Sequence, residues 1–195
     1  MGFIRIVGGS LRGRRIPVPD QGVRPTSDRT REAIFNVLGP GAVTDARVLD
    51  LYAGTGALGI EALSRGALEA RFVEGNRAVA RALRENLARL GLEERAAVLE
   101  TDLARPAWPA GADGAFDLVF LDPPYAGDAG VRWLTLLGAR PWPERGGLVV
   151  YERRKGGAAP EPPGLTIAVE RTYSETTVTF YRAAEDVRRE GKGGA

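Results

Sequence analysis

The feature that most constrains this chain is a short apolar run followed by an acid, two prolines and an aromatic residue. The run Leu118–Leu121 is continuously hydrophobic, as expected for a strand buried on both faces within a parallel sheet. Pro123 and Pro124 then end the strand, because proline has no N–H to donate to a neighbouring strand. The sequence therefore predicts an α/β protein in which Asp122 and Tyr125 lie at the carboxyl end of a central strand.

The residues after this strand also suit a particular kind of ligand. The Asp122 carboxylate and the Pro123 carbonyl are two hydrogen-bond acceptors, and Tyr125 adds an aromatic plane beside them. A planar base with an exocyclic amine would donate its two N–H bonds to these acceptors and stack on the ring. The alternative is a strand that simply ends in a proline-rich turn.

Strand and helix patterns alternate along most of the chain. Apolar spacing and capping residues predict strands at about 47–52, 71–74, 97–99, 118–121, 147–152, 165–170 and 176–181. Helices are predicted at about 28–38, with Thr26 or Ser27 as the N-cap, and at about 60–65, 77–90 and 131–137. The last two strands are joined by only a few residues, so they must be antiparallel neighbours. The prediction is a Rossmann-like, doubly wound sheet of about seven strands with a C-terminal antiparallel hairpin.

A basic segment precedes this sheet. Residues 1–31 hold seven arginines against two aspartates, a net charge of +5, which leaves −3 for the remainder because the whole chain carries +2. Two extended segments around Gly8-Gly9-Ser10 predict an N-terminal β-hairpin. We favour contact with the phosphates of a nucleic acid, because guanidinium groups match phosphate geometry. The alternative is a solvated edge hairpin whose charges prevent aggregation.

Composition removes several classes of chemistry. The chain has no cysteine and no histidine, which excludes disulfides, thiolate nucleophiles, Ser-His triads and the usual zinc ligands. We therefore expect no metal, and chemistry that uses carboxylates, the backbone and an organic cofactor. No apolar run reaches membrane-spanning length and the N-terminus has no signal-peptide core, so a cytoplasmic protein without a membrane partner is expected.

Acidic residues gather at the predicted carboxyl edge of the sheet. Asp50, Glu74, Asp102 and Asp122 each lie at or near the end of a successive parallel strand, and ligands of such sheets bind at that edge. For Asp102 the alternative is a cap of the segment that follows it. Four acids at one edge are difficult to assign to surface solubility alone.

A glycine pattern narrows the choice of cofactor. Gly54, Gly56 and Gly59 follow a strand and precede a helix, with Glu74 twenty residues beyond Gly54, which fits the dinucleotide fingerprint and leaves NAD open. Asp50 would oppose a diphosphate at this loop, because the sequence supplies no basic residue between positions 47 and 65. S-adenosylmethionine instead brings an ammonium and a sulfonium, and it carries no phosphate. These charges favour it over NAD.

Several motifs resemble a known family. Val48–Gly56 resembles the first motif of S-adenosylmethionine-dependent methyltransferases, and Asp122–Tyr125 resembles their amino-methylating signature. More narrowly, Arg5–Gly9, Arg24–Glu32 and Gly56–Gly66 are similar to the RsmD family, which methylates guanine N2 in the RNA of the small ribosomal subunit. The resemblance extends from the N-terminal hairpin to about residue 182. It departs from the wider pattern at position 52, where tyrosine replaces the glycine of many methyltransferases and agrees with the narrower family.

The resemblance implies a reaction and a set of site residues. The reaction is transfer of a methyl group from S-adenosylmethionine to N2 of a specific guanine in 16S rRNA, with guanine 966 as the family's substrate, on the small subunit or an assembly intermediate. The implied catalytic residues are Asp122, Pro123, Pro124 and Tyr125. The implied cofactor-binding residues are Arg24, Thr26, Asp50, Tyr52, Ala53, Gly54, Thr55, Gly56, Glu74, Gly75, Asp102 and Leu103. The expected RNA-binding residues are Arg5, Arg12, Arg14, Arg15, Arg29, Arg153, Arg154 and Lys155.

This interpretation divides the chain into a basic arm at 1–22, a methyltransferase domain at 23–183 and a flexible tail at 184–195. Other functions remain open at this point. They are a DNA adenine or cytosine amino-methyltransferase, a protein-glutamine methyltransferase, which the basic hairpin disfavours, a dehydrogenase, and a non-catalytic RNA-binding assembly factor. We expect a monomer, although nothing in the sequence fixes the oligomeric state.

Overall fold

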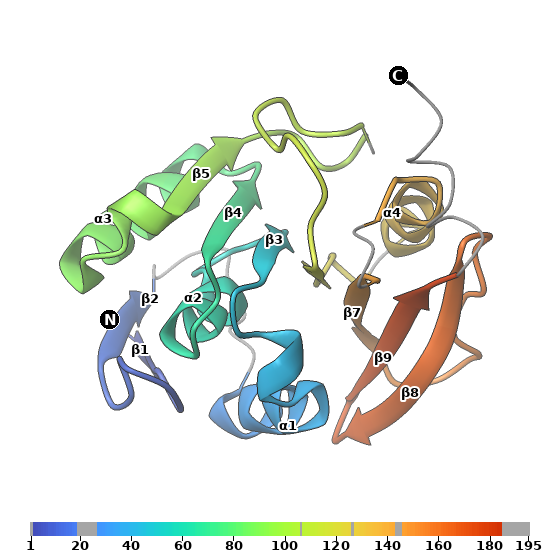
Figure 1. The fold of residues 1–195 in the computed structure, drawn as a ribbon, viewed down its shortest axis with the longest axis horizontal. Helices are drawn as coiled ribbons and strands as arrows, with labels where there is room; N and C mark the ends of the chain where they lie inside the picture. The colour runs from blue at the N-terminus through green and yellow to red at the C-terminus, as the bar shows by residue number, and fades with distance from the viewer. Residues whose placement is uncertain (1, 19–26, 106, 126, 143–145, 185–195) are drawn as a thin grey trace.

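The computed structural model describes residues 2–18, 27–105, 107–125, 127–142 and 146–184. A seven-stranded sheet runs through its centre in the order β5-β4-β3-β6-β7-β9-β8 (Figure 1). The first five of these strands pair in parallel, whereas β9 pairs antiparallel with both β7 and β8, as the sequence predicts. The strands are β3 (Arg47–Leu51), β4 (Glu69–Glu74), β5 (Ala96–Glu100), β6 (Leu118–Leu121), β7 (Leu148–Arg154), β8 (Leu165–Tyr173) and β9 (Thr176–Ala183).

Helices cover both faces of this sheet. Successive residues of β6 point to opposite sides, so Phe120 packs into the core shared with α1 and α2, and Val119 packs into the core shared with α4. Trp133 of α4 is completely buried in this second core. The helices are α1 (Asp28–Leu38), α2 (Ala57–Ser64), α3 (Arg77–Leu90) and α4 (Ala129–Gly138), with single 3₁₀ turns at η1 (Pro40–Ala42) and η2 (Glu93–Arg95).

Most helix ends follow the predicted caps. The Ser27 hydroxyl accepts from the N–H of Thr30, which makes it the N-cap of α1, and the Asn76 side chain caps α3. α2 differs, because it begins three residues before its predicted start and includes Gly59. A side chain at position 59 would collide with the ring of Phe72, so this glycine serves close packing inside the helix.

Other boundaries shift by a few residues. α4 begins at Ala129, two residues before the predicted start. β7 continues to Arg154 and β8 to Tyr173, beyond their predicted ends, because both stay paired with β9 up to Thr176. These extensions bring the ends of β7, β8 and β9 close to the pocket described below.

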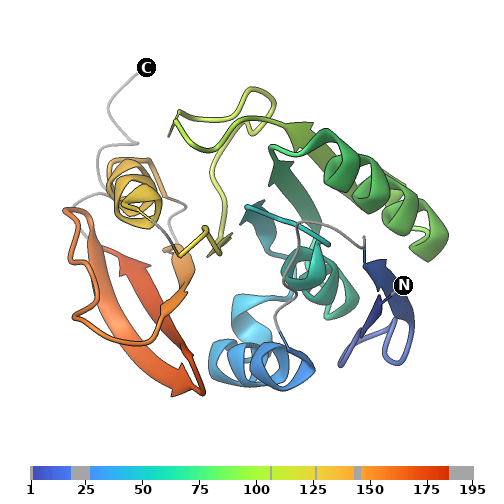
Figure 2. The ribbon, with the colours of Figure 1, turned by 180° about the vertical axis from the view of Figure 1, so that it is seen from behind.

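The predicted N-terminal hairpin is confirmed, with a longer connection than expected. β1 (Gly2–Arg5) pairs antiparallel with β2 (Arg15–Val18), and residues 6–14 connect them. Ile4 and Ile16 face each other in this pairing and are buried in the same core as α2 and α3. Figures 1 and 2 both show the hairpin beside α2 and α3.

The hairpin connection is docked on the C-terminal end of α2. The N–H of Ser10 donates to the Ser64 carbonyl at 2.7 Å, and the Ser64 hydroxyl donates to the Gly8 carbonyl at 2.6 Å. Gly9 has φ of +76°, and a side chain there would collide with the Ser64 carbonyl. The Gly8-Gly9-Ser10 motif is therefore a docking contact as well as a turn.

Two further findings concern membranes and metals. None of the helices in the described ranges is long and apolar enough to cross a membrane. Within the same ranges, no three histidine, cysteine, aspartate or glutamate side chains lie together in a way that could hold a metal ion.

Candidate active site

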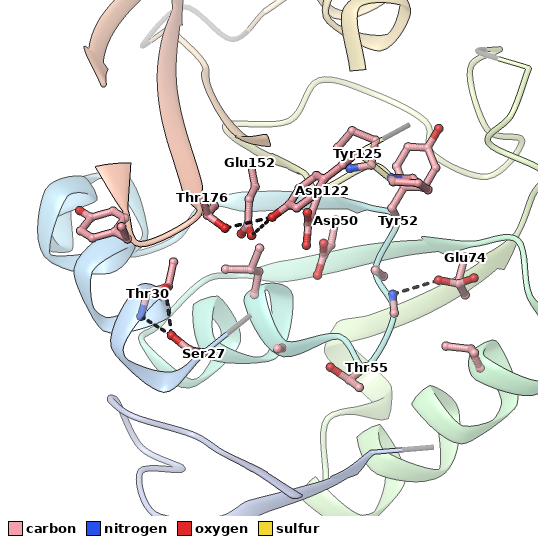
Figure 3. Close-up of a pocket in the computed structure, with 18 of the residues that line it drawn as sticks. Ser27, Thr30, Asp50, Tyr52, Thr55, Glu74, Asp122, Tyr125, Glu152 and Thr176 are labelled. Carbon is pink, nitrogen blue, oxygen red and sulfur yellow. Dashed lines mark hydrogen bonds between the residues drawn. The ribbon is translucent and has the colours of Figure 1, made fainter. Parts of the chain in front are cut away.

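A pocket of about 680 Å³ opens at the carboxyl edge of the sheet (Figure 3). Its walls come from the N-terminus of α1, the loop between β3 and α2, the loop after β6, the end of β7 and the turn between β8 and β9. A second pocket of about 420 Å³ lies next to the first, between the segments that follow β4 and β5 and the start of α4. It shares Tyr52, Glu74 and Pro124 with the first pocket. A ligand of nucleoside size could extend from one pocket to the other past Glu74.

Backbone N–H groups hold the Glu74 carboxylate at this junction. One oxygen accepts from the N–H of Gly54 at 2.9 Å, and the other accepts from the N–H of Asn76 at 2.8 Å. A carboxylate oxygen can accept more than one hydrogen bond. Glu74 is thus fixed in place and can still accept from the hydroxyl groups of a ribose.

The loop between β3 and α2 takes an unusual backbone path. Tyr52, Gly54 and Gly56 all have positive φ, at 58°, 54° and 76°. Such a conformation is rare for tyrosine. The Tyr52 hydroxyl donates to the Leu103 carbonyl at 2.8 Å, which connects this loop to the segment after β5 and closes the wall between the two pockets.

Asp50 is the most buried acid of the site. It is only 2% exposed and lines the larger pocket, where its Oδ2 accepts from the N–H of Gly59 at 2.9 Å. Burial raises the pKa of Asp50 to about 7, the negative charge of Glu74 adds to this rise, and the Gly59 N–H opposes it. A cation bound in the pocket would compensate for the cost of ionising this carboxyl group.

The loop Asp122–Tyr125, which follows the strand next to β3, forms another part of the pocket wall. Asp122 is half-buried at the end of β6, and its N–H donates to the Leu51 carbonyl at 3.5 Å. The Tyr125 side chain is 40% exposed, and its hydroxyl contacts Thr176 Oγ1 at 3.0 Å and donates to Glu152 Oε1 at 3.3 Å (Figure 3). Side chains from three strand ends therefore meet at this wall.

The chain is similar over nearly its whole length to a known family. A model described as "Conserved hypothetical protein 95" matches residues 4–182. The chain belongs to this family. It is the RsmD family that the sequence motifs resemble, so that prediction is confirmed.

Individual relatives agree with this assignment. The chain is 40% identical to "Ribosomal RNA small subunit methyltransferase D" of Escherichia coli K12, covering 93% of this chain and 90% of that protein. It is 36% identical to "Putative rRNA methyltransferase YlbH" of Bacillus subtilis, covering 92% and 98%. Among solved structures, "Putative methyltransferase yhhF from Escherichia coli" superposes with a TM-score of 0.80 at 37% identity over 93% of this chain and 98% of that one. The fold is therefore that of the α/β methyltransferases.

Most residues that the sequence assigns to a cofactor line the two pockets. Asp50, Tyr52, Ala53, Gly54, Thr55 and Glu74 line the larger pocket, and Gly75, Asp102 and Leu103 line the smaller one. Gly56 instead caps α2, and Arg24 and Thr26 lie outside the described residues. Asp102 also makes the local contact considered for it, because its Oδ1 accepts from the N–H of Ala104 at 3.0 Å.

Most of the expected RNA-binding residues are exposed, and two of them, Arg5 and Arg14, also make contacts within the chain. Arg12 and Arg15 are exposed on the hairpin, and Arg29, Arg154 and Lys155 are also exposed. Arg5 pairs with Asp28 at 3.5 Å, whereas Arg14 donates to the Arg89 carbonyl at 2.6 Å at the end of α3.

Arg153 differs from the other expected RNA-binding residues, because it is buried. Its side chain is 10% exposed and pairs with Glu170 at 2.9 Å, while also donating to the Gly156 carbonyl at 2.7 Å. The predicted strand ended at residue 152, but β7 continues to Arg154 and turns Arg153 inward. Its guanidinium group therefore makes contacts within the chain, and its expected contact with RNA remains a prediction.

Sequence reasoning missed one wall of the larger pocket. Ser27 and Thr30 at the start of α1, Glu152 on β7, and residues 173–176 between β8 and β9 all line it. Glu152 carried a usable signal, because it is a fifth acid at the end of a predicted strand. The turn between β8 and β9 carried none, because only the pairing of β7 with β9 brings it to the pocket.

Proposed function

We propose that this protein is an S-adenosylmethionine-dependent methyltransferase that modifies the exocyclic N2 of a guanine in 16S rRNA, guanine 966 being the substrate that the family resemblance implies. The observation that carries the proposal is that Asp50, Glu74 and the Asp122–Tyr125 loop line one pocket. The same pocket thus offers a carboxyl group for a cation, a carboxylate for a ribose, and acceptors for an amine. The relatives named as rRNA methyltransferases supply the substrate class.

The residues present fit this cofactor. Asp50, with its raised pKa, would lie near the ammonium or sulfonium charge, Glu74 would accept from the ribose, and Asp102 beside Leu103 would face the adenine in the smaller pocket. We include Arg24 and Thr26 in this set, from the family resemblance. Once bound, S-adenosylmethionine supplies a methyl group activated by a positively charged sulfur.

The chain's own groups would prepare the amine. The Asp122 carboxylate and the Pro123 carbonyl accept the two hydrogens of N2, which turns the nitrogen lone pair away from the ring system and towards the cofactor side. Tyr125 stacks on a base extruded from its helix. Rate acceleration then comes mainly from positioning, and Asp122 is the nearest acceptor for the proton that leaves nitrogen after transfer.

The exposed arginines would hold the surrounding RNA. α2 lines the pocket at Ala57 and meets the hairpin at Ser64, so its eight residues separate the two by about 12 Å. Arg12 and Arg15 would therefore contact phosphates that flank the target nucleotide rather than the target itself. Arg154 and Lys155, at the end of β7, lie closer to the pocket. A substrate of this kind places the enzyme in the cytoplasm.

The test compares nucleosides from small-subunit RNA incubated with and without the protein and S-adenosylmethionine. Mass spectrometry should show N2-methylguanosine only when both are present. Duplex DNA serves as a second substrate, because a DNA amino-methyltransferase would instead produce methylated adenine or cytosine. Calorimetry without any binding of S-adenosylmethionine would support a non-catalytic assembly factor and contradict the proposal.

A further inference from the structure

Glu152 lies beside the catalytic loop and has no role in the mechanism above. In the sheet, Leu121 of β6 pairs with Tyr151 of β7, so the next residues, Asp122 and Glu152, are neighbours at the ends of adjacent parallel strands. Such strands are about 4.8 Å apart. Figure 3 shows Asp50, Asp122 and Glu152 next to one another in the pocket.

The order of these three acids follows the order of the strands. Asp50 belongs to β3, Asp122 follows β6 and Glu152 belongs to β7, and these strands are consecutive in the sheet. Phe120 of β6 pairs with both Asp50 and Val150, so Asp122 and Glu152, two residues further along their strands, share the face of Asp50. Asp122 therefore lies between the proposed cofactor side and Glu152.

Glu152 is a fixed part of the pocket wall. It is 7% exposed, and its Oε1 accepts from the Tyr125 hydroxyl, which also contacts Thr176. An acidic side chain in such a position carries a substantial desolvation cost. Its carboxylate also lines the pocket beside Asp122, within reach of a donor on a ligand that is held there.

The chemistry of the bases distinguishes what this carboxylate can accept. In guanine, the ring nitrogen next to the exocyclic N2 amine carries a hydrogen and is a donor. In adenine and cytosine, the ring nitrogen next to the exocyclic amine is an acceptor, which a carboxylate repels. With an amine held at Asp122, the adjacent ring position would lie towards β3 or towards β7. β3 is the proposed cofactor side, and β7 presents the Glu152 carboxylate.

We propose that Glu152 accepts the N1–H of the target base and thereby makes the site specific for guanine. This inference rests on the function proposed above and assigns to one residue the choice among bases that carry an exocyclic amine. A carboxylate that accepts from a donor on the correct base discriminates strongly against a base that presents an acceptor at the same position.

The test uses small-subunit particles reconstituted with 16S RNA that carries either guanine or 2-aminopurine at the modified position. 2-Aminopurine keeps the N2 amine but has an acceptor at N1. The wild-type protein should prefer guanine by about 100-fold in kcat/KM. Glu152→Gln, whose amide can donate to an N1 acceptor, should reduce this preference to less than about 10-fold. Where turnover is too slow, equilibrium binding of both RNAs to the cofactor-loaded protein should show a preference for guanine in the wild type that Glu152→Gln reduces.

Two variants separate this role from simpler ones. Glu94→Gln removes the same charge from an exposed position in η2, outside both pockets, and it should leave the preference unchanged. Tyr125→Phe removes the hydroxyl that Glu152 holds but keeps the ring, and it should also retain the preference. Equal loss of preference in Tyr125→Phe and Glu152→Gln would overturn the inference, because Glu152 would then act only by positioning Tyr125.

The outcomes also separate this inference from the function on which it rests. Normal methylation of guanine by the wild type, with an unchanged preference in Glu152→Gln, would overturn the role of Glu152 alone. Absence of methyl transfer to guanine by the wild type would overturn the proposed function and this inference with it.

Discussion

The two halves of the pocket hold their polar groups in different ways. On the side of β3, β4 and β5, backbone N–H groups fix the acids, as Gly59 does for Asp50, and Gly54 and Asn76 do for Glu74. On the side of β6, β7 and β9, side chains hold one another, as Tyr125 does with Glu152 and Thr176. The acids of the first half are therefore held by the backbone, whereas the groups of the second half are held by other side chains. The proposed cofactor residues Asp50 and Glu74 lie in the first half, and the residues proposed to hold the base lie in the second.

The half of the pocket on the side of β6, β7 and β9 is the side-chain half, and the half on the side of β3, β4 and β5 is the backbone-held half. The largest effect should follow from removing Asp122, the proposed acceptor in the side-chain half. Asp122→Ala should reduce methyl transfer by about 10³-fold or more, because the amine loses the group that orients it. Binding of S-adenosylmethionine, measured by calorimetry, should stay within about threefold of the wild type. A variant with near-normal turnover would contradict the role of Asp122.

The corresponding substitution in the backbone-held half should mainly weaken the binding of the cofactor. Asp50→Asn keeps an acceptor for the Gly59 N–H but removes the charge, so the affinity for S-adenosylmethionine should fall by roughly 10-fold to 100-fold. The cofactor-free protein should become more stable at pH 8, by about 5 °C in its unfolding midpoint, because a buried charge is gone. Equal affinity in both proteins would remove Asp50 from the cofactor site.

The raised pKa of Asp50 predicts that both protein stability and cofactor affinity depend on pH. Between its ordinary pKa of 3.8 and its folded pKa of about 7, the folded protein holds a proton that the unfolded chain has released. The contribution of Asp50 to stability thus becomes less favourable as pH rises through this window, and it is constant above pH 7. Cofactor affinity should change in the opposite direction and increase by up to about tenfold from pH 6 to pH 8. Calorimetry on Asp50→Asn should show a nearly flat profile.

The expected RNA-binding arginines line neither half of the pocket, so replacing them should change only the binding of RNA. Replacing Arg12 and Arg15 with alanine should weaken RNA binding several-fold and lower the slope of log affinity against log salt by about 0.7 for each phosphate that is no longer neutralised. Cofactor affinity should not change. Arg14→Ala is the matched control, because Arg14 caps the end of α3 and its removal should lower stability more than RNA affinity.

The smallest effect should come from the edge of the side-chain half. Thr176→Val removes one of the two partners of the Tyr125 hydroxyl and keeps the shape of the side chain. Turnover should fall by about twofold to fivefold, with unchanged cofactor binding. A large loss of stability in this variant would show that the β8–β9 turn is held to the rest of the sheet mainly through this hydrogen bond.

The sequence predicted the backbone-held half better than the side-chain half, for a physical reason. Glycines and acids at strand ends are local signals, so Asp50, Gly54 and Glu74 could be assigned before the fold was known. Glu152, Thr176 and the inward turn of Arg153 depend on where β7 ends and how it pairs with β9. Such long-range register leaves little trace in a single sequence.

The docking of Gly9 on Ser64 fixes the hairpin to the far end of a helix that starts at the pocket. The hairpin is thus held at one end of α2, and the pocket opens at the other end. An RNA that contacts both the hairpin and the pocket must span the length of α2 between them. Under the proposed function, the modified guanine must lie at this distance from the nucleotides that contact the hairpin, so the folded shape of the RNA would contribute to substrate selection.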